Sequence, residues 1–80
     1  MIPVESSQIK SVGYDSELKA LYIEFKTGAV YVYYDVVDTH YKMLCTPTIS
    51  AGSYFAKEVK PFYEYAKLAV IVENGTITLP

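Results

Sequence analysis

The chain has no arginine and no tryptophan, and it contains one cysteine, Cys45, and one histidine, His40. A lone cysteine cannot form a disulfide within the chain, so the composition fits a reducing compartment. The first residues, 1–5, lack the basic and apolar regions of a secretory signal peptide. We therefore expect a cytoplasmic protein.

Long apolar runs are also missing. The longest aliphatic run covers residues 68–72 and is far shorter than the ~20 residues of a membrane-spanning helix. The sequence therefore predicts no membrane partner.

Positive charge is scarce as well. Seven lysines stand against nine acidic residues, and the formal net charge is −2. Tight binding of long DNA or RNA depends on many cations that neutralise phosphates, so this composition disfavours a long nucleic acid as partner. A small ligand that carries few phosphates remains compatible with it.

Groups for catalysis and metal binding are equally few. Only Asp38 and Cys45 flank His40 closely, whereas nucleophilic catalysis needs a positioned base and structural zinc needs three or four soft ligands. The four glycines are isolated and form no phosphate-binding loop. We predict no enzyme, no metal and no cofactor, with His40 partly exposed and Cys45 buried as a small apolar residue.

Aromatic residues, by contrast, are abundant: nine tyrosines and three phenylalanines in 80 residues. A single domain of this size draws only about 3 to 5 kcal/mol from its core. A homo-oligomer is therefore expected, and some tyrosines are expected on the surface.

Three stretches have the alternation or β-branched and aromatic content of strands: residues 8–14, 20–25 and 29–35. Polar turns separate them, which predicts a three-stranded antiparallel meander. If residues 26–28 all form the second turn, Ile23 faces Tyr31, and both Tyr31 and Tyr33 belong to the core. If only Thr27 and Gly28 do, Ile23 faces Val32, and Tyr31 and Tyr33 join Tyr22 in an outward ladder. Turn chemistry favours the first register.

Two short helices follow. Asp38 is a candidate N-cap for a helix that ends at Leu44, before Thr46 and Pro47. Ser50 is a candidate N-cap for a second helix over residues 51–59, and its stripe of Ala51, Phe55 and Val59 is expected to face the sheet. Pro61 ends this helix, and residues 62–65 are expected to be extended.

The end of the chain predicts a β-hairpin. Residues 67–73 and 76–79 flank Asn74-Gly75, a preferred two-residue turn, and the turn pairs Glu73 with Thr76. One face of this hairpin is strongly apolar, so it must pack on the domain or on another subunit. The predicted fold is α+β: a three-stranded antiparallel meander covered by two short helices, plus a C-terminal β-hairpin. Residues 1–66 form the main unit, and residues 67–80 are either part of the same domain or an oligomer contact.

The order of these features resembles the KTSC domain, a family found at the C-terminus of some lysyl-tRNA synthetases and in stand-alone bacterial and phage proteins. The resemblance covers residues 4–65 and rests on Ser6-Ser7, Ile9, Gly13-Tyr14-Asp15, Leu21, Ile23, Phe25, Gly28, Tyr31, Tyr33, Val36, Ser50, Gly52, Tyr54-Phe55 and Tyr63. It implies no established activity, only a suggested binding of RNA. Departures from the family pattern are Ala51 in place of lysine, Val37 in place of proline and the absence of arginine.

Two features indicate a binding function. The start of the second helix offers amide groups, hydroxyls and lysines that suit a phosphate or carboxylate, and tyrosine rings can stack on nucleotide bases. The predicted ligand-binding residues are Ser50, Gly52, Ser53, Tyr54, Lys57, Lys60, Tyr31 and Tyr33. We predict a non-catalytic module for a nucleotide-like ligand, in one version a phage-encoded sponge for a cyclic nucleotide signal. The alternatives are a protein interaction or oligomerisation module, with the hairpin as a candidate contact, and a weak RNA-binding module.

Overall fold

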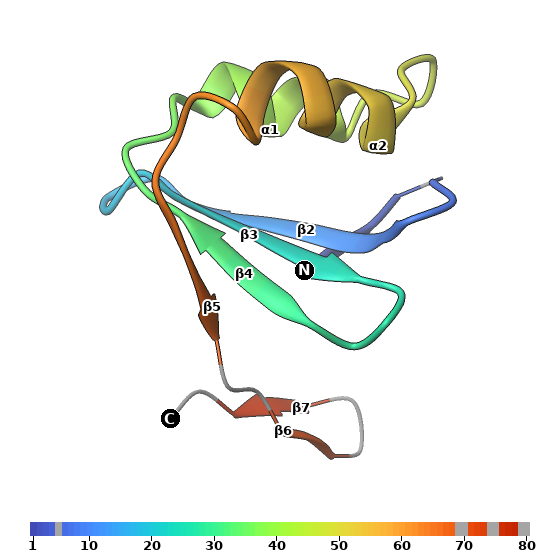
Figure 1. Ribbon diagram of the computed structural model, residues 1–80, viewed down its shortest axis with the longest axis vertical. Coiled ribbons are helices and arrows are strands. Elements are labelled where there is room, and N and C mark those ends of the chain that lie inside the picture. Colours follow the sequence, from blue (N-terminus) through green and yellow to red (C-terminus); the bar gives the residue numbers. More distant parts are fainter. Residues whose placement is uncertain (5, 69–70, 74–75, 79–80) are drawn as a thin grey trace.

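The computed structural model describes residues 1–4, 6–68, 71–73 and 76–78, and for residues 71–73 and 76–78 it describes the backbone. An antiparallel sheet forms one layer, and the helices form a second layer over one of its faces (Figure 1). The sheet has five strands in chain order: β1 (Ile2–Pro3), β2 (Ile9–Asp15), β3 (Ala20–Phe25), β4 (Val30–Tyr33) and β5 (Tyr65–Leu68). The predicted α+β class is confirmed. The predicted three strands lie at the centre, and β1 and β5 add an edge on each side.

The β3–β4 register is the one that turn chemistry favours. Ile23 lies opposite Tyr31, and the backbone N–H of Phe25 donates to the carbonyl of Ala29 at 2.9 Å. Gly28 has a φ of 94°, a left-handed conformation that glycine adopts without strain. Tyr33 is therefore a core residue with 2% exposure, as predicted, but Tyr31 is only half-buried because it packs on the rim of the core.

Helix α1 (Asp38–Leu44) begins one residue earlier than predicted. Val37, not Asp38, occupies the N-cap position, and no side chain caps this end. Asp38 instead forms an ion pair with Lys42 one turn later, at 3.3 Å. The prediction of an Asp38 cap was therefore wrong, because Asp38 is the first residue inside the helix.

The second helical segment covers the predicted range in two parts, α2 (Ala51–Tyr54) and the π-helical η1 (Phe55–Val59). Its stripe of Ala51, Phe55 and Val59 is buried against the sheet, as predicted. The wider winding of η1 is seen where the N–H of Lys60 donates to the carbonyl of Phe55, five residues back. Ser50 does occupy the N-cap position, but its hydroxyl makes no capping hydrogen bond.

The chain after η1 departs from the prediction. Residues 60–63 form turns and a bend, so only Tyr65 of the predicted extended residues 62–65 lies in a strand, β5, which pairs with β4. Lys67 and Leu68 therefore belong to the main sheet rather than to the hairpin, so the predicted unit boundary at residue 66 falls inside β5. The prediction missed this pairing because β4 and β5 lie more than 30 residues apart in the chain.

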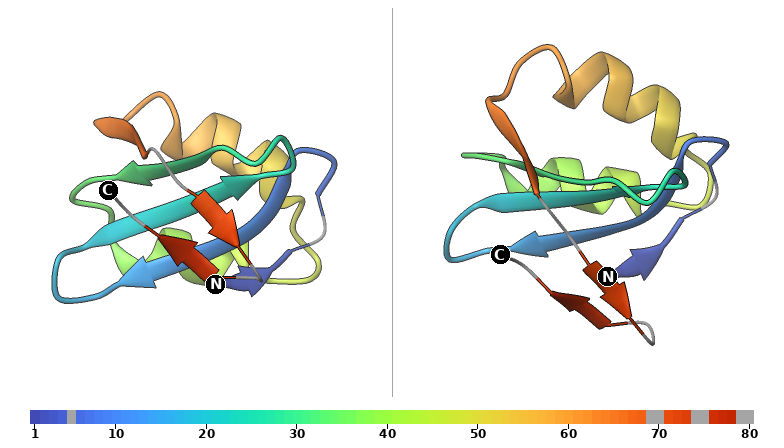
Figure 2. Two further views of the ribbon diagram at one scale, coloured as in Figure 1. Left: turned by 90° about the horizontal axis from the view of Figure 1, so that it is seen from below. Right: turned by 60° about the horizontal axis from the view of Figure 1, so that its bottom comes forward.

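The hairpin itself consists of β6 (Ile71–Glu73) and β7 (Thr76–Thr78), with Glu73 opposite Thr76 as predicted. It lies on the side of the sheet that the helices leave open (Figure 2). The predicted Asn74-Gly75 turn and the predicted strand residues 69, 70 and 79 lie outside the described residues.

The core lies between the sheet and the helical layer. Its buried members come from β2, β3, β4, α1 and the second helical segment: Ile9, Val12, Leu21, Ile23, Tyr33, Val36, Leu44, Ala51, Phe55 and Val59. Cys45 is half-buried beside this core, so it is more exposed than predicted. Within the described ranges, no helix has the length and apolarity needed to cross a membrane.

Candidate functional site

The predicted ligand-binding residues do not form one site. The second helical segment divides them between two hollows. Tyr31, Tyr33 and Lys60 line one of them. The other is lined by Ser50, Ser53, Tyr54 and Lys57.

The first hollow, which we call the aromatic groove, lies between η1 and the sheet. It has a volume of about 240 Å³ and is lined by Gln8, Phe25, Tyr31, Tyr33, Phe55, Ala56 and Lys60. The rings hold each other in place: Phe25 meets Tyr31 edge-to-face with centroids 5.5 Å apart, and Tyr33 meets Phe55 at 5.2 Å. Edge-to-face contacts of this kind stabilise aromatic pairs beyond simple burial. The walls of the groove are therefore aromatic rings that pack on one another.

Two of the tyrosines in the aromatic groove are also held from the edge strand. The Tyr65 ring of β5 stacks on Tyr31 with centroids 5.6 Å apart and lies 5.4 Å from Tyr33. Burial is the main reason that the pKa of Tyr33 is raised to about 12, and the neighbouring Tyr65 and Tyr31 raise it further. Tyr33 therefore keeps its hydroxyl proton across the physiological range.

The second hollow, which we call the helix-start hollow, has a volume of about 250 Å³ and lies on the outer side of α2. Besides the predicted residues it contains Ile49 and Glu58. Burial raises the pKa of Tyr54, and the nearby Glu58 carboxylate and then Tyr63 add smaller increases. The Glu58 carboxylate opposes an anion here, so this hollow suits a phosphate less well than the lysines alone indicate.

Gly52 has a structural role instead of a place in either hollow. A β-carbon at this position would lie 2.8 Å from the hydroxyl oxygen of Ser6, which is closer than real contacts allow. That oxygen accepts hydrogen bonds from the backbone N–H groups of Gln8 and Ile9, both at 3.2 Å. Ser6 and Gly52 therefore join the N-terminal loop to α2 by close packing.

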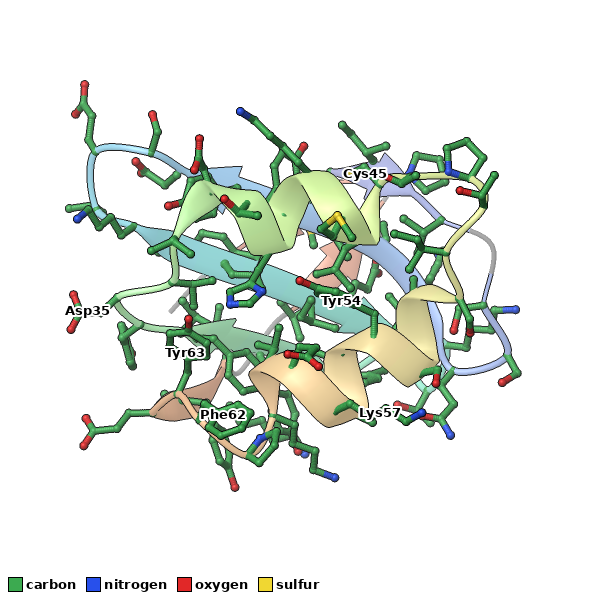
Figure 3. All side chains as sticks on the ribbon, turned by 90° about the horizontal axis from the view of Figure 1, so that it is seen from above. Asp35, Cys45, Tyr54, Lys57, Phe62 and Tyr63 are labelled. Carbon is green, nitrogen blue, oxygen red and sulfur yellow. The ribbon has the colours of Figure 1, made fainter. Side chains whose placement is uncertain are left out.

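A cluster that the sequence did not predict joins the two helical segments. His40 of α1 lies with its Nδ1 atom 2.8 Å from the Tyr54 hydroxyl and its Nε2 atom 3.0 Å from the Tyr63 hydroxyl. Figure 3 shows Tyr54 pointing toward α1 and Tyr63 at the other end of the gap between the helical segments. A neutral imidazole carries one N–H, so one tyrosine donates to His40 and the other accepts from it.

His40 is half-buried, which confirms the predicted partial exposure, but the prediction missed that tyrosine hydroxyls engage both ring nitrogens. Spacings of 14 and 23 residues carry no local signal, so the chain alone could not have revealed this cluster. Across residues 1–4, 6–68, 71–73 and 76–78, no group of three or more His, Cys, Asp or Glu side chains is placed to hold a metal ion.

Comparison with known proteins agrees with this architecture. The KTSC domain family matches residues 5–65 of the chain. The chain belongs to the KTSC family.

Proteins with similar sequences and similar lengths occur in other organisms. A protein of Tsukamurella paurometabola is 37% identical over 68 residues, which is 85% of this chain and all of that protein. An uncharacterized protein of Stutzerimonas stutzeri is 32% identical over 84% of this chain and 94% of its own length. The crystal structure of a KTSC domain protein from Yersinia pestis superposes with a TM-score of 0.76 at 30% identity, covering 82% of this chain and 92% of that one.

Six of the residues that carry the KTSC resemblance lie at three places in the structure. Tyr31 and Tyr33 line the aromatic groove, Tyr54 and Tyr63 hold His40, and Ser6 packs on Gly52. Packing and hydrogen bonds within the domain therefore explain Tyr54, Tyr63, Ser6 and Gly52. Of the two groove tyrosines, Tyr33 is buried, and Tyr31 keeps exposed surface.

Proposed function

We propose that this KTSC domain is a non-catalytic module that binds a small, phosphate-bearing ligand of nucleotide type in the aromatic groove. The observation that supports it is the joint presence of Tyr31, Tyr33 and Lys60 in one groove. Stacking on an aromatic side chain contributes about 1–3 kcal/mol per base, and it tolerates any base because every base has a flat face. The lysine adds attraction for the phosphate.

The size of the groove favours a small ligand. Its volume of about 240 Å³ is below the range of about 300 Å³ upward that holds a whole drug-sized molecule. We infer that one planar ring enters the groove and that the phosphate stays outside it, near the exposed Lys60. A long nucleic acid would need many more cations than this surface offers.

The state of the only imidazole supports a module without catalysis. Both nitrogens of His40 are engaged by tyrosine hydroxyls, so this residue is not poised to take a proton from a bound ligand. A concrete version of the proposal is a phage-encoded or bacterial protein that sequesters a cyclic nucleotide signal in the cytoplasm without turning it over.

Calorimetry with a panel of cyclic and linear mono- and dinucleotides tests the proposal. At least one should bind, and Lys60→Glu should weaken its binding. Lys10→Glu is the matched control, because it makes the same charge change at an exposed site away from the groove. Absence of binding across the panel, or equal losses in both variants, would overturn the proposal.

We propose a protein interaction or oligomerisation module as the second candidate. Phe62 is 72% exposed and Tyr65 is 56% exposed, and large aromatic side chains are common anchors of protein interfaces. The double variant Lys57→Glu with Lys60→Glu should then leave the molar mass in solution unchanged. Deleting residues 69–80 tests whether the hairpin forms the contact between copies. The deletion starts after Leu68 so that the pairing of β5 with β4 is kept.

Weak RNA binding is the third candidate, and the salt dependence distinguishes it. Affinity for an RNA strand should fall steeply as salt rises, whereas a ligand with few phosphates should show a shallow dependence.

A further inference from the structure

The outer edge of β5 offers a defined set of backbone groups. The N–H of Tyr34 donates to the carbonyl of Glu64 at 2.9 Å, and the register continues with Val32 opposite Ala66. Residues of an antiparallel strand bond alternately to one side and to the other. Ala66 and Leu68 therefore bond to β4, and the N–H and C=O groups of Tyr65 and Lys67 point away from the sheet.

The two edges of the sheet differ in how open they are. Strand β1 is two residues long and includes Pro3, which has no N–H to donate. Short strands and prolines are the usual ways in which proteins prevent edge pairing. Strand β5 has four residues, no proline and a regular register, and in the described part of the chain no strand pairs with its outer side.

We infer that β5 pairs in antiparallel fashion with β5 of a second copy of this chain. A two-fold axis perpendicular to the sheet keeps each side chain on the same face of the sheet in both copies. Since side chains alternate between the faces along a strand, residues that lie opposite each other in the dimer must differ in number by an even amount. The register that uses the outward groups of both residues places Tyr65 opposite Lys67 of the second copy. Ala66 then lies opposite Ala66 of the second copy, at the two-fold axis.

The side chains fit this register. Tyr65 and Lys67 are exposed on the same face of the sheet, so each lysine can lie over the exposed tyrosine ring of the other copy, twice in the dimer. The two Ala66 residues at the axis form no hydrogen bonds with each other, because their backbone groups bond to β4. Such a pair has its α-carbons only about 4.5 Å apart, and the small side chain of alanine fits this spacing. The result is one continuous sheet through both copies.

This inference rests on the proposed self-association and is independent of the ligand in the aromatic groove. It assigns the contact to β5 rather than to the C-terminal hairpin. The decisive variant is Lys67→Pro, because the N–H that proline removes points away from β4 and the fold should be kept. Ala66→Pro is its matched control, since it removes a hydrogen bond to β4 and should destabilise the monomer itself.

Light scattering of the full chain over a concentration series gives the molar mass. We expect twice the chain mass of 9.0 kDa for the wild type and 9.0 kDa for Lys67→Pro, with an unchanged circular dichroism spectrum. Wild-type protein that stays monomeric at every concentration would overturn both self-association and the β5 contact. A folded Lys67→Pro variant that stays dimeric would overturn the β5 contact alone.

A crosslink tests the register even if Lys67→Pro does not fold. In a Cys45→Ser background, Ala66→Cys should form a covalent dimer under a mild oxidant, because the two cysteines face each other across the axis. Lys67→Cys should crosslink much less, since its opposite residue is Tyr65. Equal crosslinking of the two variants, or none, would contradict the register. Nucleotide binding by monomeric Lys67→Pro then shows whether the ligand proposal stands separately.

Discussion

The two sides of the helical layer are built differently. The side toward the sheet is apolar, with Leu44, Ala51, Phe55 and Val59 buried against the strands. The outer side has an exposed ion pair on α1 and an open hollow with mixed charges on α2 and η1. Regular apolar spacing therefore places a helix on its sheet, but it does not decide which polar groups end up side by side.

The largest expected effect is on the side toward the sheet. Phe55→Ala removes a ring that contacts both Phe25 and Tyr33, so it should lower the free energy of unfolding by about 3–5 kcal/mol. Urea denaturation measures this loss, and Lys57→Ala on the outer side of the same segment is the control. Similar losses in the two variants would remove the difference between the two sides.

The next effect separates the two hollows. If the ligand lies in the aromatic groove, Lys60→Glu should weaken nucleotide binding about tenfold or more, which is about 1.4 kcal/mol. Lys57→Glu changes charge equally but lines the helix-start hollow, so it should have a much smaller effect. Calorimetry with the two single variants measures both, and the reverse order would move the site to the helix start.

A smaller effect is expected where α2 meets the N-terminal loop. Gly52→Ala should lower the free energy of unfolding by about 1 kcal/mol, because the clash with the Ser6 hydroxyl exceeds the helix preference of alanine. Combining it with Ser6→Gly should cost less than the sum of the single changes. Thermal unfolding of the four proteins in this double-mutant cycle gives the coupling, and strict additivity would argue against the contact.

High pH tests the ring beneath η1. Tyr33 has a folded pKa of about 12 against an ordinary value of 10.0, so the folded state holds this proton more tightly than the unfolded state. Its contribution to stability is complete below pH 10.0 and is lost as the pH rises through about 12. Urea denaturation at several pH values should show this decline, and Tyr33→Phe should show less of it.

The smallest effect belongs to the outer side of α1. Lys42→Ala removes the ion pair with Asp38. The side chain of Lys42 is 74% exposed and that of Asp38 is 59% exposed. The loss in unfolding free energy should be no more than about 0.5 kcal/mol, and high salt should reduce it further. A loss above about 1 kcal/mol by thermal unfolding would show that α1 depends on its outer side more than exposed pairs usually allow.

Local patterns were enough for several features of this molecule. Three turn residues with glycine last predicted the β3–β4 register, and a four-residue apolar spacing predicted the buried side of the second helical segment. Non-local pairing was missed: β5 returns to β4 from the far end of the chain. The π-helical winding of η1 was also missed, because no apolar or capping pattern in residues 51–59 distinguishes it from an α-helix.

The candidate site was predicted only in part. Tyr31, Tyr33 and Lys60 do share a groove, but the other predicted residues lie in a second hollow or, for Gly52, against Ser6. Residues close in the sequence, such as Lys57 and Lys60, were expected to act together. Both lie on the same segment, yet they line different hollows, since winding of the backbone sets the direction of each side chain.

Sequence patterns alone were enough to predict the α+β class, the central strands, the buried stripe of the second helical segment and the KTSC family of the chain. These follow from spacings and turn preferences that act over a few residues. The contacts of Tyr54 and Tyr63 with His40, the packing of Ser6 on Gly52 and the place of β5 at one edge of the sheet came only from the folded arrangement. Such contacts join residues far apart in the chain, and the packing of whole elements brings them together.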